Sequence, residues 1–339
     1  MANILISGYY GFGNLGDELL LEAILNDLRQ VDPRGKVTVL SARPLETAKR
    51  FGVRAVCRTD PFALMGEMRR CDLLLSGGGT LLQDATSRQS LWYYLTVLRL
   101  AGALQKPVVV YSQGIGPLRH PRHQELVGRA LERAEVITLR DEASAGLLEQ
   151  MGVRLPYAVT ADPVLSLAEQ SGERDERRIG WVLHGGLCGS RTLEVLGEAM
   201  MELNRQGYPS VLLPFYPRQD GGAVERLSTW GEAVEPERVR REIGRCGRVI
   251  SMRLHGLILG AAVGSRVLAL SDDPKVAGFL DGMGLPEGRL PERLTAGELV
   301  QEVLHRARQA EPHRLEEAKG RLEENRRQLK TLIMKRYKT

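Results

Sequence analysis

Short runs of β-branched residues and leucine alternate with helical segments along the whole chain, and this alternation restricts the possible folds more than any other feature. The runs are NILIS, KVTVLS, DLLLS, PVVVYS and EVITL in the first half, and RIGWVLH, SVLLPF, GRVIS and RVLAL in the second. Such alternation is typical of βα units in parallel sheets. The sequence therefore predicts an α/β protein with doubly wound parallel sheets.

The length and one polar stretch predict how the chain divides. At roughly 150 residues per domain, 339 residues favour about two domains. The segment AEQSGERDERR, residues 168–178, is highly charged and has no apolar periodicity, which predicts a linker. We expect one domain over 1–170, a second over 179–310, and a charged helix over 311–339 that packs back on the first. Clefts between domains are favoured ligand sites, so we expect the ligand between the two lobes.

Composition excludes several protein classes. The four cysteines are far apart and form no CxxC pair, so neither a zinc ribbon nor a disulfide framework is indicated, and a reducing cytosol fits best. The opening MANILIS resembles a first strand rather than a secretory signal. No apolar run reaches the roughly 18 residues that a membrane span needs, because LWYYLTVLRLAGAL contains Arg99. We therefore expect a cytoplasmic protein.

The charge is mildly positive and unevenly placed. Lysine and arginine outnumber the acids 47 to 42, and a net charge of +5 is too small to indicate nucleic acid as a partner. The last stretch, RRQLKTLIMKRYKT, is basic and contains no acidic residue. Two interpretations stay open: peripheral contact with an anionic membrane surface, or a solvated helix end whose cations suit the helix dipole.

Three glycines after the first predicted strand invite a cofactor hypothesis. Gly11, Gly13 and Gly16 match the pattern GxGxxG. The match to a dinucleotide site is weak, since two tyrosines separate the strand from the first of these glycines and the second strand ends without an acidic residue for a ribose. Arg43 after that strand would suit a 2′-phosphate instead. In the alternative interpretation the glycines permit a tight turn, and Asn14 and Asp17 cap a helix from about residue 17 to residue 29.

Two further loops follow predicted strands. The sequence SGGGT, residues 76–80, is expected to open a helix, where the amides of Gly77, Gly78 and Gly79 would form a phosphate cradle. A turn dictated by packing is the alternative. The segment SQGIGP closes another strand and places Gln113 at its end.

Cations and one histidine also follow predicted strands. Arg140 follows EVITL, where its guanidinium would bind a carboxylate or phosphate, or pair locally with Asp141 or Glu142. Arg253 and His255 follow GRVIS and precede an apolar helix, a position that favours function for the histidine.

Among the other histidines only His184, after WVL, is a rival to His255, and the other four are expected in solvent. Lys275 follows Pro274, which should fix a turn. Together these cations predict a site for a small, multiply charged anion, with no carboxylate set that suits a metal.

In order and spacing these segments resemble the polysaccharide pyruvyl transferases, and among them the CsaB-type enzymes that act on secondary cell-wall polymers. The resemblance rests on SGYYGFGNLGDE, SGGGTLLQD, SQGIGPL, LRDEAS, TADPVL, SMRLHGLILGA and DDPKVAGF. It implies a GT-B-like architecture with two Rossmann-like domains facing a central cleft. The implied donor is phosphoenolpyruvate, with no other cofactor, and the implied acceptor is a lipid-linked glycan of the N-acetylmannosaminyl-N-acetylglucosamine type at the inner face of the membrane. The implied product is a 4,6-ketal, with release of phosphate.

The resemblance also implies residue roles. The family's functional arginine, histidine and lysine fall on Arg140, His255 and Lys275. Related sequences have Tyr-Asp-Pro-Lys where this chain has Asp-Asp-Pro-Lys. Protonation of an enol ether phosphate at carbon requires a general acid, and histidine is suited to that near neutral pH, so His255 is the candidate. The alternatives are a GT-B glycosyltransferase that uses a nucleotide sugar, and an inactive glycan-binding assembly factor.

Overall fold

The computed structural model describes residues 1–85, 87–168 and 172–337, and the chain forms two compact units. The first comprises residues 1–12, 17–163 and the chain from 318 onward, and the second comprises residues 13–16 and 164–317. Gly13–Gly16 lie within the first predicted domain but group with the second unit.

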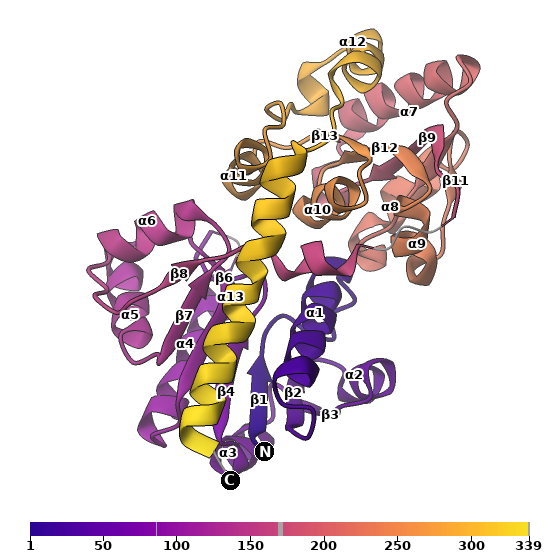
Figure 1. Ribbon diagram of the computed structural model, residues 1–339. Helices are drawn as coiled ribbons and strands as arrows, with labels where there is room; N and C mark the ends of the chain where they lie inside the picture. The colour runs from indigo at the N-terminus through magenta and orange to yellow at the C-terminus, as the bar shows by residue number, and fades with distance from the viewer. Residues whose placement is uncertain (86, 169–171, 338–339) are drawn as a thin grey trace. The chain divides into compact units, whose positions relative to one another are not determined.

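The first unit is built on a parallel sheet with the strand order β3-β2-β1-β4-β6-β7-β8, to which β5 is added through β6 (Figure 1). The strands are β1 (Asn3–Ser7), β2 (Lys36–Ser41), β3 (Arg54–Cys57), β4 (Leu73–Gly77), β5 (Thr80–Leu82), β6 (Val108–Ile115), β7 (Val136–Leu139) and β8 (Ala158–Val159). The helices are α1 (Leu15–Val31), α2 (Pro44–Phe51), α3 (Pro61–Arg70), α4 (Arg88–Ala103), α5 (Pro121–Leu131), α6 (Glu142–Gln150) and α13 (Pro312–Tyr337). The predicted parallel α/β arrangement is confirmed.

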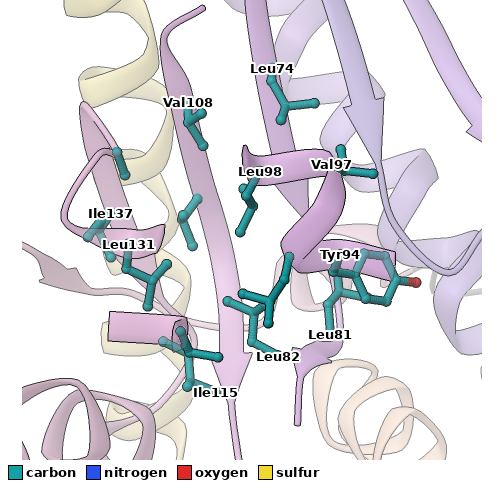
Figure 2. Close-up of a cluster of buried hydrophobic side chains, with 14 of the residues drawn as sticks. Leu74, Leu81, Leu82, Tyr94, Val97, Leu98, Val108, Ile115, Leu131 and Ile137 are labelled. Carbon is teal, nitrogen blue, oxygen red and sulfur yellow. The ribbon is translucent and has the colours of Figure 1, made fainter. Parts of the chain in front are cut away.

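Side chains alternate between the two faces of this sheet, and each face has its own core. Ile4 and Ile6 of β1 pack in a core with α1 and α13 residues, whereas Leu5 packs with α4 residues on the other side. Figure 2 shows part of the second core, with Leu74 and Val108 from the sheet near Leu98 of α4. Both faces are therefore covered by helices, as a parallel sheet requires.

Helix α13 belongs to the first unit over most of its length. Leu329, Leu332 and Ile333 enter the core beside β1 and β4. Asn325 Nδ2 donates to Ser112 Oγ at 2.6 Å, and Arg326 forms an ion pair with Asp27 at 3.0 Å. Arg336 also pairs with Glu135. Arg327 pairs with Glu324, so the three arginines of the basic stretch from residue 326 are all in ion pairs, and its residues 338 and 339 lie outside the described chain.

The second unit has a parallel sheet with the order β11-β10-β9-β12-β13. Its strands are β9 (Asp175–Val182), β10 (Ser210–Leu212), β11 (Glu232–Ala233), β12 (Cys246–Ser251) and β13 (Arg266–Ala269). Its helices are α7 (Ser190–Arg205), α8 (Pro217–Leu227), α9 (Val239–Ile243), α10 (Leu254–Ala262), α11 (Pro274–Gly282) and α12 (Ala296–Gln301). The fully buried Trp181 of β9 lies in its core.

Two local predictions are wrong. Strand β9 begins at Asp175, inside the predicted linker, and Asp175 already pairs with Cys246 of β12. The first residues of the strand are exposed and charged, so their sequence resembles that of a linker. The glycines 77–79 do not open a helix. Gly78 and Gly79 have positive φ, of 79° and 68°, and the chain then continues as β5 alongside β6, so that α4 begins only at Arg88. Residues 169–171 of the predicted linker lie outside the described chain.

Candidate functional site

Polar side chains follow one another along the carboxyl edge of the first unit's sheet. Ser7 ends β1 and is in register with Ser76 of β4, and Ser76 Oγ donates to Gln113 Oε1 of β6 at 3.4 Å. Ser7 Oγ and Gln113 Nε2 are buried without a hydrogen-bond partner among the described residues. Ligands of doubly wound sheets bind at this edge. Gln113 therefore lies at the edge where ligands of such sheets bind, and its role as a substrate contact stays a prediction.

Close packing accounts for the glycines of the loop 77–79. Tyr10 Oη donates to the carbonyl of Gly77 at 2.6 Å, and a Cβ on Gly78 would come within 3.1 Å of the same hydroxyl oxygen. A Cβ on Gly79 would lie 3.1 Å from Asp17 Oδ1, so Asp17 and the loop are neighbours. The amide cradle at a helix N-terminus that the sequence predicted is not present, since no helix begins here.

Arg140 is buried at the end of β7 and is held by three side chains. Its Nε donates to Asp141 Oδ2 at 3.2 Å, its Nη1 to Asp162 Oδ2 at 3.5 Å and its Nη2 to Thr80 Oγ1 at 3.0 Å. Asp141 also caps α6 by accepting from the Ser144 N–H at 2.8 Å. Both interpretations of Arg140 thus retain support, because the local ion pair exists and the guanidinium still lies at the carboxyl edge. Asp162 was not among the predicted site residues, although it lies in the segment TADPVL.

In the second unit, the loop Gly13–Gly16 lies against His255. Asn14 Oδ1 accepts from the Gly16 N–H at 3.1 Å, which is the predicted cap, but α1 begins at Leu15, two residues before the predicted start, and Asp17 lies within its first turn. The Leu15 N–H donates to the carbonyl of Phe215 at 2.7 Å. A Cβ on Gly16 would lie only 2.2 Å from His255 Nδ1, so the imidazole packs directly on this glycine. The third glycine of the GxGxxG pattern thus makes room for the predicted catalytic histidine.

Arg253 anchors the loops around His255. It precedes α10, and its Nη2 donates to Asp220 Oδ1 at 2.5 Å while its Nε donates to the carbonyl of Leu183 at 2.8 Å. Asp220, which is fully buried on α8, also accepts from the backbone N–H groups of Gly185 and Tyr216. No sequence pattern marked Asp220. The ion pair with Asp220 ties the loop after β12, which carries Arg253, to the loops that follow β9 and β10. The Arg253 side chain is only partly exposed.

His184, the rival histidine, belongs to the same cluster. Burial lowers its pKa, and the nearby positive charges of Arg253 and Lys275 lower it further, although Asp220 opposes them. Its Nδ1 is buried without a hydrogen-bond partner among the described residues. The charges of Arg253 and Lys275 both act on His184, so the three side chains form one electrostatic group. A site for an anion needs such a group of cations.

Lys275 lies in the first turn of α11, where Asp273 both caps the helix and pairs with the lysine. Asp273 Oδ1 accepts from the Lys275 N–H at 3.0 Å, and Oδ2 lies 3.0 Å from Nζ. The Lys275 side chain is 46% exposed, so this pair is solvated and contributes little to stability. The lysine can exchange this partner for another anion.

Four histidines were expected in solvent. His120, His305 and His313 are exposed, as predicted, but the prediction is wrong for His123. Its Nδ1 lies 2.7 Å from Asp84 Oδ2, and its side chain is only 12% exposed. Asp84 holds the loop before α5 by accepting backbone N–H groups as well, so His123 has a structural partner.

A hollow of about 1040 Å³ opens at the opposite, amino-terminal edge of the first unit's sheet, lined among others by Asn3, Lys36 and Arg54. Arg54 is paired with Glu67 there. None of the predicted site residues lines this hollow. We give more weight to the carboxyl edges, where the polar side chains converge. Within the described residues no helix is long and apolar enough for a membrane span, and no His/Cys/Asp/Glu group suits a metal ion.

Comparison with known proteins adds a family and a fold. A family model described as polysaccharide pyruvyl transferase matches residues 14–274, which include all the predicted site residues except Lys275. No curated protein matches the chain.

Among solved structures, the UDP-GlcNAc 2-epimerase of Methanocaldococcus jannaschii is 12% identical, with 97% of this chain and 98% of that one covered and a TM-score of 0.64. The Neisseria meningitidis UDP-GlcNAc 2-epimerase bound to UDP-GlcNAc is 13% identical, with 95% and 99% covered and a TM-score of 0.59. A Rickettsia africae glycosyltransferase is 11% identical, with 100% and 99% covered and a TM-score of 0.58. At these identities the likeness shows a shared GT-B-like fold of two parallel-sheet α/β domains.

Proposed function

Because the chain belongs to the polysaccharide pyruvyl transferase family, we propose that it transfers the enolpyruvyl group of phosphoenolpyruvate to a glycan. The acceptor is a terminal N-acetylmannosamine on a lipid-linked cell-wall precursor, and the product is a 4,6-ketal. The observation that carries the proposal is the family match, which includes His255 and the loop residues packed against it.

The reaction defines what the side chains must do. A proton adds to the methylene carbon of phosphoenolpyruvate, and a sugar hydroxyl attacks the central carbon. The bond from that carbon to the phosphate oxygen breaks, and the second hydroxyl closes the ketal. Of the two protons that the hydroxyls lose, one balances the proton now on the methyl group and the other leaves with phosphate. The site therefore needs a proton donor and cations for the carboxylate and the phosphate.

His255 is the proposed proton donor. It lies in the first turn of α10, and Gly16 fixes the position of its ring on one side. His184 is less suited to this role, because burial and the Arg253 charge lower its pKa and favour the neutral imidazole. His184 is therefore the weaker candidate for the general acid.

Three cations are proposed to bind the carboxylate and the phosphate of the donor. Lys275 has a solvated ion pair that it can exchange for phosphate, and Arg253 is held in place by Asp220. Arg140 donates three hydrogen bonds to protein side chains, and the guanidinium N–H groups that these bonds leave would contact the donor. Gln113, Asp17 and the glycines 77–79 of the first unit, and Asn14 beside His255 in the second, are the further substrate contacts in this proposal.

The lipid-linked acceptor places the reaction at the cytoplasmic face of a membrane in this proposal. The exposed basic residues near the end of α13, such as Lys335, would favour an anionic lipid surface. No further cofactor is needed, since phosphoenolpyruvate supplies both the transferred group and the leaving phosphate.

Phosphate release from phosphoenolpyruvate tests the proposal. It is measured with and without a soluble N-acetylmannosaminyl-N-acetylglucosamine acceptor, for the unaltered protein and for His255→Ala. Acceptor-dependent release that is lost in His255→Ala supports both the reaction and its acid. No release, together with a rise in melting temperature on addition of a nucleoside diphosphate, would favour a nucleotide-sugar glycosyltransferase. Acceptor binding without any phosphate release would favour a glycan-binding assembly factor.

A further inference from the structure

A buried arginine surrounded by aromatic rings lies at the carboxyl edge of the first unit. Arg58 directly follows β3 and is 7% exposed. Its Cζ lies 3.9 Å from the centroid of the Tyr93 ring, 5.1 Å from that of Phe12 and 5.3 Å from that of Tyr94. Phe12 in turn stacks on Tyr9 with the ring centroids 4.0 Å apart and the planes at 7°. We call Arg58 and these four rings the arginine–aromatic cluster.

The charge of Arg58 is not neutralised by the part of the chain that the structure describes. No carboxylate there lies within 4 Å, and its hydrogen bonds go to neutral oxygens at long distances, 3.4 Å to Gly8 O and 3.5 Å to Tyr94 Oη. The buried Arg140 is paired with carboxylates, and Arg248 donates to the Glu176 carbonyl at 2.8 Å. Buried charges are normally paired or well hydrogen-bonded. Arg58 therefore lacks a strong hydrogen-bond acceptor among these residues.

A second group in the cluster also lacks a hydrogen-bond acceptor. Tyr93 Oη is buried and receives only a weak interaction from the Arg58 guanidinium, and no acceptor for its own O–H lies among the described residues. Burial raises the pKa of Tyr93, and the Arg58 charge opposes that rise, so the hydroxyl stays protonated and can donate. A guanidinium and a neighbouring hydroxyl donor form a suitable site for phosphate oxygens. Aromatic rings beside them provide apolar faces against which a pyranose ring can pack.

We propose that the arginine–aromatic cluster binds a sugar that carries a phosphate, with the phosphate on Arg58 and Tyr93 and the sugar against Tyr9 and Phe12. The three-carbon donor has no ring for these faces, so the cluster fits the acceptor better. In a lipid-linked acceptor this phosphate is the one that joins the glycan to the lipid. That identification rests on the proposed function, whereas the binding of a sugar phosphate does not.

Isothermal titration with N-acetylglucosamine 1-phosphate tests the assignment. Arg58→Gln should weaken its binding about 10- to 100-fold, the range for a hydrogen-bonded charge, and Tyr93→Phe about 2- to 10-fold. Phosphoenolpyruvate affinity should change in neither variant. Arg43→Gln is the matched control, because Arg43 follows the neighbouring strand β2 but is paired with Glu46. It should bind both ligands like the unaltered protein.

Several outcomes would overturn the assignment. One is an unaltered protein that does not bind the sugar phosphate, and another is an Arg58→Gln variant that binds it unchanged. A loss of phosphoenolpyruvate affinity instead would make the cluster a donor site. If Arg58→Gln does not fold, Tyr93→Phe decides, since it keeps the ring and removes only the hydroxyl. If phosphoenolpyruvate is never turned over while sugar phosphate binding still depends on Arg58, the proposed function fails and the binding site stands.

Discussion

Replacing Gly16 with alanine should inactivate the protein without unfolding it. The added Cβ would lie 2.2 Å from His255 Nδ1 and 2.8 Å from Cγ, whereas ordinary contact requires about 3.4 Å. The imidazole must therefore move by about 1 Å, the scale of displacement that costs on the order of 10²-fold in rate. Alanine is favoured over glycine in helices by up to about 1 kcal/mol, and Gly16 lies in the first turn of α1, so stability should hold. We expect kcat for phosphate release to fall about 100-fold with the melting temperature nearly unchanged.

Gly297→Ala is the matched control for this prediction. Gly297 is the second residue of α12, as Gly16 is of α1, and a Cβ there meets nothing within 4 Å. Its kcat should equal that of the unaltered protein. Full turnover in a folded Gly16→Ala variant would show that the position of the His255 ring does not limit the reaction, and would refute the reasoning that links this contact to catalysis.

Two further predictions concern the histidines. His255→Ala should lower kcat by about 10²- to 10⁴-fold, the usual contribution of a general acid, while phosphoenolpyruvate affinity measured by titration stays the same; a large loss of affinity would contradict the assigned role. His184 has a lowered pKa in the folded chain, so between that pKa and its ordinary value of 6.5 the unfolded chain binds more protons. The free energy of unfolding should therefore fall as the pH drops below 6.5. His184→Gln should reduce this slope in urea titrations, and an unchanged slope would contradict the assignment.

The sheets could be predicted from the sequence because their strands are buried on both faces. NILIS, KVTVLS and GRVIS stand out as apolar runs, and each became a strand with nearly the predicted ends. Strand β3, Arg54–Cys57, was missed because it lies at the sheet edge with partly exposed side chains. That omission also hid Arg58, the residue directly after it. A search for cations after short edge strands would have found both.

Contacts between distant segments could not be predicted from residue spacing. Gly16 looked like part of a dinucleotide pattern, and only the packing of His255 against it shows why a side chain is excluded there. Asp220 had no pattern at all, since its importance comes from meeting Arg253 more than thirty positions away. Ser112 has a positive φ of 43° and lies in a register shift between β6 and β7. Its hydroxyl accepts from Asn325 of α13, a contact with a distant segment that no local pattern predicts.

The partners of Arg140 and Lys275 predict different consequences for their removal. Arg140 is buried between Asp141 and Asp162, so Arg140→Ala leaves carboxylates without their cation, a change that costs about 3–5 kcal/mol for a buried pair. Lys275 is half-exposed, and its pair with Asp273 contributes at most about 1 kcal/mol. Lys275→Ala should therefore weaken phosphoenolpyruvate binding with little change in the urea midpoint, whereas Arg140→Ala should lower that midpoint as well. Equal midpoints for the two variants would mean that the buried carboxylates do not depend on Arg140, and Arg140 would then be available to the donor as fully as Lys275.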